Sequence, residues 1–88
     1  MKPYQVVLTT EAQTDLRKIA STIRTRLLDK LEWMGDNAEI IQHQALQGDE
    51  WKGLFKYRVG DYRIVYQLDH PSAKLTVLKV GHRREVYK

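Results

Sequence analysis

The sequence contains no cysteine, which excludes disulfide bonds and zinc sites built on thiolate ligands. It has no apolar run approaching the roughly 18 residues that span a membrane, and its first residues lack the apolar segment of a signal peptide. No two histidines have the spacing of metal ligands, and neither a Ser-His-Asp arrangement nor a Gly-rich phosphate loop is present. We therefore expect a cytoplasmic protein that uses no metal or other cofactor and makes no membrane contact.

The chain is also short, at 88 residues, and this length predicts a single domain covering residues 1–88. A chain of this size buries only about 60–65% of the surface that its unfolded form exposes. We therefore expect marginal stability, which a binding partner would increase.

Positive charge is concentrated in the second half of the chain. Residues 1–48 hold six basic and six acidic side chains, whereas residues 49–88 hold nine basic and five acidic ones. A local excess of positive charge attracts polyanions such as nucleic acids by releasing their counterions. A solvated basic face without a ligand is the alternative, and charge alone favours neither.

The first half predicts a strand followed by a helical region. Residues 4–9 are mainly β-branched and apolar, which is typical of a short strand. Thr10 with Gln13 predicts a capped helix start, and apolar residues then recur at steps of three and four as far as Met34. The polar residues near 20–22 could interrupt this helix, so one long helix and a helical hairpin are both allowed.

The second half predicts a sheet. Residues 38–53 show no sustained period and predict a connector that could hold one helical turn. Alternation then predicts strands at residues 54–59, 62–69 and 75–80, and the short loops between them predict antiparallel pairing. We expect an α+β fold of order β-α(α)-β-β-β, with the helices packed on one face of the sheet.

Strand alternation also predicts which side chains share a face. If Gly60-Asp61 is a two-residue turn, Val59 pairs with Tyr62 and Arg58 lies directly opposite Arg63. Two guanidinium groups in this position repel each other and lower the stability of the sheet. A bound anion would offset that cost.

The last predicted strand extends this arrangement. A register that brings Leu75 near Asp69 places Gly81 beside Arg63 and keeps Arg83 on the same side of the sheet. Arginine suits bidentate phosphate binding, and a lysine adds a compact positive charge. We therefore predict a phosphate-binding cluster that consists of Lys56, Arg58, Arg63 and Arg83. A solvated basic face without a ligand is the alternative.

Such a cluster could support RNA cleavage without a metal, which needs a base, cations around the phosphate and an acid for the leaving oxygen. Candidates for proton transfer are Tyr87, His82 and Arg83. Tyr87 is included because neighbouring cations lower the pKa of a tyrosine. Parity places His82 on the other face, where a structural histidine is the alternative. We expect His43 and His70 to lie in loops without partners.

Two tryptophans remain to be placed. Trp33 lies beside the helical stripe, so we expect it in the core or facing a partner. Trp51 precedes the first strand of the second half, where packing is the main expectation and stacking on a nucleobase the alternative.

Four segments resemble the RelE branch of the RelE/ParE toxin superfamily: residues 46–48 (LQG), 55–58 (FKYR), 60–66 (GDYRIVY) and 80–87 (VGHRREVY). The resemblance covers nearly the whole chain and implies that the helical region is a hairpin with a break near residues 20–22. It also implies a ribosome-dependent mRNA interferase, an endoribonuclease that cuts mRNA in the ribosomal A site through 2′-hydroxyl attack. Such a toxin inhibits translation.

The resemblance assigns roles to individual residues. Lys56 and Arg63 would stabilise the scissile phosphate, Arg83 would protonate or support the leaving group, and Tyr87 would orient or deprotonate the 2′-hydroxyl. Leu54 stands where the family has a second lysine, which Lys52 could replace from the preceding segment. Phosphate contacts are expected from Arg58, Lys52, Lys79 and Arg84.

The resemblance further implies a cognate RelB-like antitoxin as partner, besides the ribosome and mRNA. The toxin–antitoxin complex would be oligomeric and would bind operator DNA through the antitoxin. The alternative function is that of a ParE-like, non-enzymatic inhibitor of DNA gyrase, and a plain RNA-binding module is a third hypothesis.

Overall fold

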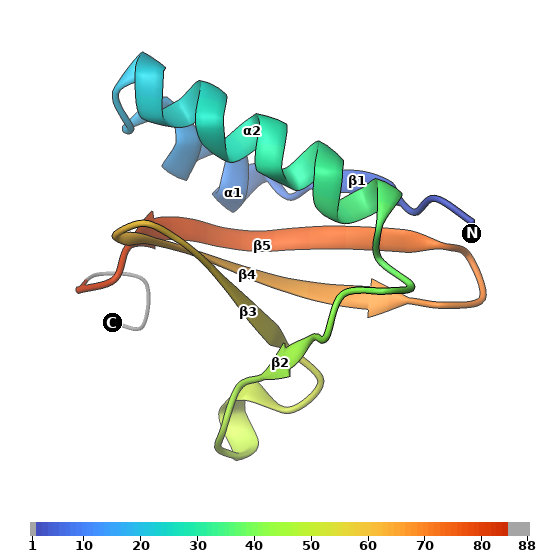
Figure 1. The fold of residues 1–88 in the computed structure, drawn as a ribbon. Helices are drawn as coiled ribbons and strands as arrows, with labels where there is room; N and C mark the ends of the chain where they lie inside the picture. Colours follow the sequence, from blue (N-terminus) through green and yellow to red (C-terminus); the bar gives the residue numbers. More distant parts are fainter. Residues whose placement is uncertain (1, 85–88) are drawn as a thin grey trace.

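The computed structural model describes residues 2–84, which form a five-stranded sheet with two α-helices on one of its faces (Figure 1). The predicted α+β class and the packing of both helices on one face are confirmed. The elements are, in chain order, β1 (Gln5–Leu8), α1 (Thr10–Arg17), α2 (Ser21–Asp36), β2 (Gln44–Ala45), the 3-10 helix η1 (Asp49–Trp51), β3 (Phe55–Val59), β4 (Tyr62–Asp69) and β5 (Lys74–His82).

The helical region is a hairpin, because residues 18–20 separate α1 from α2 and belong to neither helix. The break therefore lies close to the predicted residues 20–22. The N-cap of α1 is Thr9 rather than Thr10, and its hydroxyl accepts the backbone N–H of Ala12 at 3.1 Å. This bond satisfies one of the free N–H groups at the start of the helix.

The core lies between the helices and the sheet. The helices contribute fully or nearly fully buried side chains such as Leu27, Leu31 and Met34, and the sheet contributes Ile64 and Tyr66 among others. Burial of each large aliphatic side chain contributes about 1.5–3 kcal/mol. The apolar stripe of the helices and the alternation of the strands therefore meet as the sequence predicts.

The strand order is β1-β5-β4-β3-β2. Strands β3, β4 and β5 form the predicted antiparallel meander. The parallel pairing of β1 with β5 is a feature that local sequence patterns do not predict, and neither is β2. Strand β2 lies within the predicted connector and covers only Phe55 and Lys56 of β3.

A β-bulge interrupts the pairing of β4 with β5. Tyr66 pairs with Val77, but the next residue, Val65, pairs with Lys79, so Leu78 is the extra residue. The expectation that Leu75 lies beside Asp69 is therefore off by one residue at this end, where Leu75 pairs with Leu68. Beyond the bulge the predicted register is restored.

Thr9, which lies between β1 and α1, forms hydrogen bonds to the bulge. Its hydroxyl lies 2.9 Å from the carbonyl oxygen of Val77 and 3.3 Å from that of Leu78. The bulge keeps both Val77 and Val80 on the core side, and it turns Lys79 and Gly81 to the opposite face. Within residues 2–84, neither helix is long and apolar enough to cross a membrane.

Candidate functional site

The face of the sheet opposite the helices carries two adjacent rows of side chains, which we call the basic face. Tyr57, Val59 and Ile64 belong to the hydrophobic core, so the alternate residues of β3 and β4 point to this face. The row next to the β3–β4 turn contains Arg58, Arg63 and Gly81, and the second row contains Lys56, Val65 and Lys79. Neighbouring rows stand about 7 Å apart.

The pairing of Arg58 with Arg63 is confirmed, as are the pairing of Val59 with Tyr62 and that of Arg63 with Gly81. Gly60 has a φ of +59°, the left-handed conformation that the first position of this two-residue turn favours. Next to such a turn, Arg58 and Arg63 form a pair without mutual backbone hydrogen bonds, in which opposite Cα atoms are only about 4.5 Å apart. Two positive charges are thus held close together.

The two arginines differ in their surroundings. Arg58 is exposed, and its Nε donates a hydrogen bond to the carbonyl oxygen of Gly60 at 3.0 Å, which holds the side chain near the turn. Arg63 is half-buried, and its Nε is buried completely. A partly desolvated guanidinium interacts more strongly with an anion than one in bulk water. Arg63 is therefore the stronger electrostatic centre of the pair.

The second row has an apolar floor, formed by Val65, which was not among the predicted site residues. Val65 is only 1% exposed although it lies outside the hydrophobic core between helices and sheet. Lys56 and Lys79 are its direct neighbours on β3 and β5. The sequence did contain a signal for this floor, because Val65 is an apolar residue on the otherwise polar side of the strand alternation. Lys79 lies near α1, with its Nζ 3.7 Å from a carboxylate oxygen of Glu11.

The residues after β5 approach the β3–β4 turn. The backbone N–H of Arg83 donates to the carbonyl oxygen of Asp61 at 2.8 Å, which brings Arg83 to the same end of the sheet as Arg58. Arg84 follows and is also exposed. Tyr87, the predicted partner of the 2′-hydroxyl, lies outside the residues that the structure describes.

Lys52 lies away from the cluster. It follows η1 and precedes β3, so the length of β3 separates it from Arg58 and the turn. The structure thus brings together Lys56, Arg58 and Arg63, with Arg83 at the same end of the sheet, and it leaves Lys52 beyond the other end.

His82 lies on the core side of the sheet, as strand parity predicts. It pairs with Tyr62, and the two rings meet edge to face with centroids 5.7 Å apart. Its Nδ1 accepts the backbone N–H of Arg84 at 3.3 Å. His82 therefore packs beneath the site instead of joining the cluster.

The expectation that His43 and His70 have no partners is wrong. His43 Nδ1 lies 2.6 Å from the hydroxyl of Tyr66, and its Nε2 lies 2.7 Å from the carbonyl oxygen of Ala38. His70 Nδ1 lies 2.6 Å from the hydroxyl of Tyr4. Both histidines tie loops to distant elements, and these contacts depend on the tertiary fold.

The arrangement suits the binding of an anion such as a phosphodiester. Donors from β3 and β4 lie on one face of the sheet, and Gly81, which has no side chain, pairs with Arg63. Cations in fixed positions stabilise negative charge that develops on a reacting phosphate. Among residues 2–84, no three His, Asp or Glu side chains gather as a metal site.

The sequence can be compared with known proteins. Residues 6–87 match the family described as the ParE toxin of the type II toxin-antitoxin system parDE. The chain is 31% identical to the toxin RelG of Mycobacterium tuberculosis, over 98% of both chains. It is 30% identical to the mRNA interferase toxin RelE of Escherichia coli, over 86% of this chain and 81% of that protein.

A solved structure shares the fold. The toxin–antitoxin complex RelBE2 of Mycobacterium tuberculosis contains a chain that superimposes with a TM-score of 0.83 and 28% identity, covering 97% of each chain. The sequence resemblance, the order of the elements and the basic face thus agree with one another. The chain belongs to the RelE/ParE family of toxins from type II toxin–antitoxin systems, and it is of the RelE type.

Proposed function

We propose that this toxin is a ribosome-dependent endoribonuclease that cuts mRNA in the ribosomal A site without using a metal ion. The observation that carries the proposal is the close pair of Arg58 and Arg63, with Lys56 in the next row of the same face. Like charges held opposite each other repel, and a bound phosphodiester would attract both guanidinium groups. One relative is named an mRNA interferase, which is in keeping with this chemistry.

In the proposed reaction the 2′-hydroxyl of one nucleotide attacks the adjacent phosphorus. A base takes the hydroxyl proton, the bond to the 5′-oxygen breaks, and that oxygen receives a proton, so a 2′,3′-cyclic phosphate remains. Lys56 and Arg63 would stabilise the charged phosphorane, and Arg83 would protonate or support the leaving oxygen. Tyr87 would orient or deprotonate the 2′-hydroxyl. Arg58, Lys79 and Arg84 would hold flanking phosphates.

A RelB-like antitoxin is the proposed partner, because the solved relative is a toxin–antitoxin complex. An acidic segment that folds on binding would cover the basic face and exclude RNA from it. We propose that the resulting complex is oligomeric and binds operator DNA through the antitoxin.

The decisive experiment induces the wild type and the double variant Arg83→Ala, Tyr87→Phe in cells and maps mRNA ends by sequencing. We expect growth arrest with cuts at fixed codon positions in translated messages, and loss of both in the variant. Lys74→Ala is the matched control, because Lys74 is an exposed cation at the far end of β5 and should leave the cuts unchanged.

The alternative, a ParE-like inhibitor of DNA gyrase, is favoured by the description of the matching family. Toxicity that persists in the double variant, with intact messages and damaged DNA, would establish that alternative and refute the nuclease. Efficient cutting of naked RNA by the purified protein would refute only the requirement for the ribosome.

A further inference from the structure

The side of α2 that faces β3 forms a groove at the edge of the sheet, which we call the β3 groove. The groove is open because β2 pairs only with the first two residues of β3, so residues 57–59 have no strand on the side away from β4. Its main lining residues are Arg26, Asp29, Lys30 and Trp33 from α2, with Tyr57 and Arg58 from β3.

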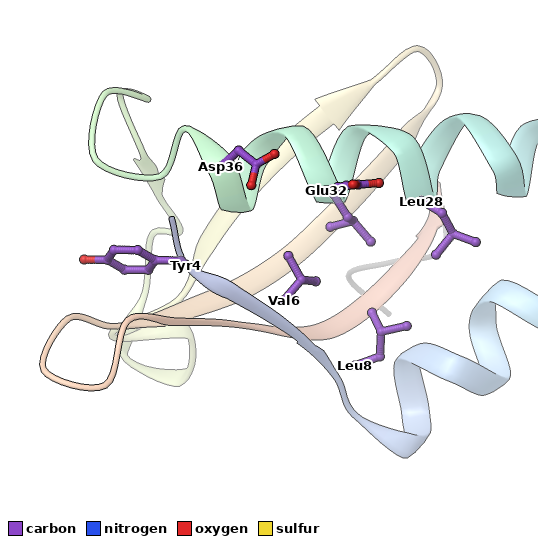
Figure 2. Close-up of a pocket in the computed structure, with 7 residues that line it drawn as sticks. Tyr4, Val6, Leu8, Leu28, Glu32 and Asp36 are labelled. Carbon is purple, nitrogen blue, oxygen red and sulfur yellow. The ribbon is translucent and has the colours of Figure 1, made fainter. Parts of the chain in front are cut away.

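The two sides of α2 carry opposite charge. In the β3 groove three cations accompany the single carboxylate of Asp29. The groove on the other side, between α2 and β1, is lined by aliphatic side chains and Tyr4, together with the carboxylates of Glu32 and Asp36, as Figure 2 shows. The β3 groove is therefore the side of the helix that suits a polyanion.

Trp33 gives the β3 groove an exposed aromatic ring. Its side of the helix lies outside the core, and the residue remains 45% exposed. The ammonium group of Lys30 lies 4.2 Å from the Trp33 ring centroid and 5.5 Å from that of Tyr57. Surfaces that bind single-stranded nucleic acid combine cations for the phosphates with aromatic rings on which bases stack. The β3 groove contains both.

The β3 groove is continuous with the basic face. Arg58 lines the groove and also stands beside Arg63 on β3 and β4. A single strand whose phosphate lies at Arg63 can thus pass Arg58 at the end of β3 and reach α2. The residues that line the groove of Figure 2 include no lysine or arginine. No cation among them therefore links that groove to the basic face, as Arg58 does for the β3 groove.

We propose that the β3 groove is a second binding site for single-stranded RNA, with a base stacked on Trp33 and phosphates at Arg26, Lys30 and Arg58. The proposal rests on the proposed function, because it extends the path of the RNA that the basic face would cut. An acidic protein segment is the competing occupant, and the experiment below separates the two.

The test measures binding of a dye-labelled RNA of about 12 nucleotides, methylated at every 2′-oxygen so that it cannot be cut. Trp33→Ala should weaken binding about 5- to 150-fold, the range for loss of one stacked base. The double variant Arg26→Ala, Lys30→Ala should lower the salt dependence of binding, by about 0.7 in the logarithmic slope for each phosphate that is no longer neutralised. Leu28→Ala and Glu32→Ala on the other side of α2 are the controls and should bind as the wild type does.

Tryptophan fluorescence supplies a readout that a purely structural role would not change. RNA should quench the emission of the wild type, and most of this quenching should disappear in Trp33→Phe, which retains Trp51. Circular dichroism and thermal unfolding of each variant show that it is folded. Because Trp33 is partly exposed, Trp33→Phe should unfold within a few degrees of the wild type, with a shift of about 4 °C or less.

Equal RNA affinity and equal quenching in wild type and Trp33 variants would overturn the proposal. The proposal would also be overturned if the wild type did not bind RNA. The same holds if an acidic peptide bound in the groove and RNA did not displace it. Cleavage of translated mRNA on purified ribosomes is measured in parallel. If the wild type cuts while Trp33→Ala keeps the same KM, the second site is refuted and the proposed nuclease stands. If the wild type does not cut, the proposed function fails.

Discussion

Removal of the buried hydroxyl of Tyr66 should loosen the connector between α2 and β3 from the sheet. Tyr66 is fully buried, and its hydroxyl lies 2.6 Å from His43 Nδ1. His43 Nε2 lies 2.7 Å from the carbonyl oxygen of Ala38. A carbonyl oxygen can only accept, so Nε2 carries the proton and Nδ1 accepts from Tyr66. Burial raises the pKa of the Tyr66 hydroxyl, which therefore keeps the proton that it donates.

The expected magnitude follows from this geometry. Tyr66→Phe removes the donor and leaves Nδ1 of His43 without a partner, and a buried polar group in this state costs about 1–3 kcal/mol. His43 is only half-buried, so water can satisfy part of the loss and we expect about 1–2 kcal/mol. In a domain of this size each kcal/mol lowers Tm by about 4–8 °C.

The assay is urea unfolding followed by far-UV circular dichroism, for wild type, Tyr66→Phe, His43→Leu and the double variant. The coupling energy between the two positions should be about 1 kcal/mol, because both substitutions remove the same hydrogen bond. Tyr62→Phe is the matched control. Among the described residues the Tyr62 hydroxyl has no hydrogen-bond partner, so its loss should change stability by less than about 0.5 kcal/mol.

Two results would refute this reasoning. One is a Tyr66→Phe variant as stable as the wild type. The other is a double variant whose loss equals the sum of the single losses, which would show that His43 and Tyr66 do not stabilise each other.

Three further predictions concern the helices and the basic face. Gly35→Ala should destabilise the protein by about 1–3 kcal/mol in urea, because a Cβ would lie 2.7 Å from the carbonyl oxygen of Tyr4; a stabilised variant would contradict this close packing. Thr9→Val should cost about 1–2 kcal/mol, and Thr9→Ser should restore the loss, because the hydroxyl accepts from the start of α1 and donates to Val77. Inorganic phosphate should raise the Tm of the wild type more than that of Arg58→Gln, and the difference should shrink as sodium chloride increases. Equal shifts in both proteins would show that Arg58 takes no part in anion binding.

The start of the helix hairpin shows how far a local signal reaches. The capping box predicted Thr10 as the cap, but the cap is Thr9, whose hydroxyl also bonds to β5. The position of Thr9 is fixed by two interactions, the cap of α1 and the hydrogen bond to β5. Only the cap can be predicted from the local sequence. The apolar stripe, in contrast, predicted most of the buried face of both helices, since the 3.6-residue period places these residues on one side, although Leu28 remains 40% exposed.

The sequence by itself determined the features that depend on neighbouring residues. Alternation located the three meander strands, and the two-residue turn at Gly60-Asp61 set their register, so the sequence alone places Arg58 opposite Arg63. A short turn leaves the two strands no other pairing that keeps their apolar residues on one face. The heart of the basic face was therefore predictable.

Only the tertiary structure decided the contacts between segments far apart in the chain. The parallel pairing of β1 with β5, the bulge at Leu78 and the partners of His43 all join residues whose meeting no local pattern specifies. The same holds for the β3 groove, which exists because β2 ends early and α2 lies with its cationic side toward the open edge of β3. Such contacts arise from the packing of whole elements, and one-dimensional periodicity carries no information about which surfaces come together.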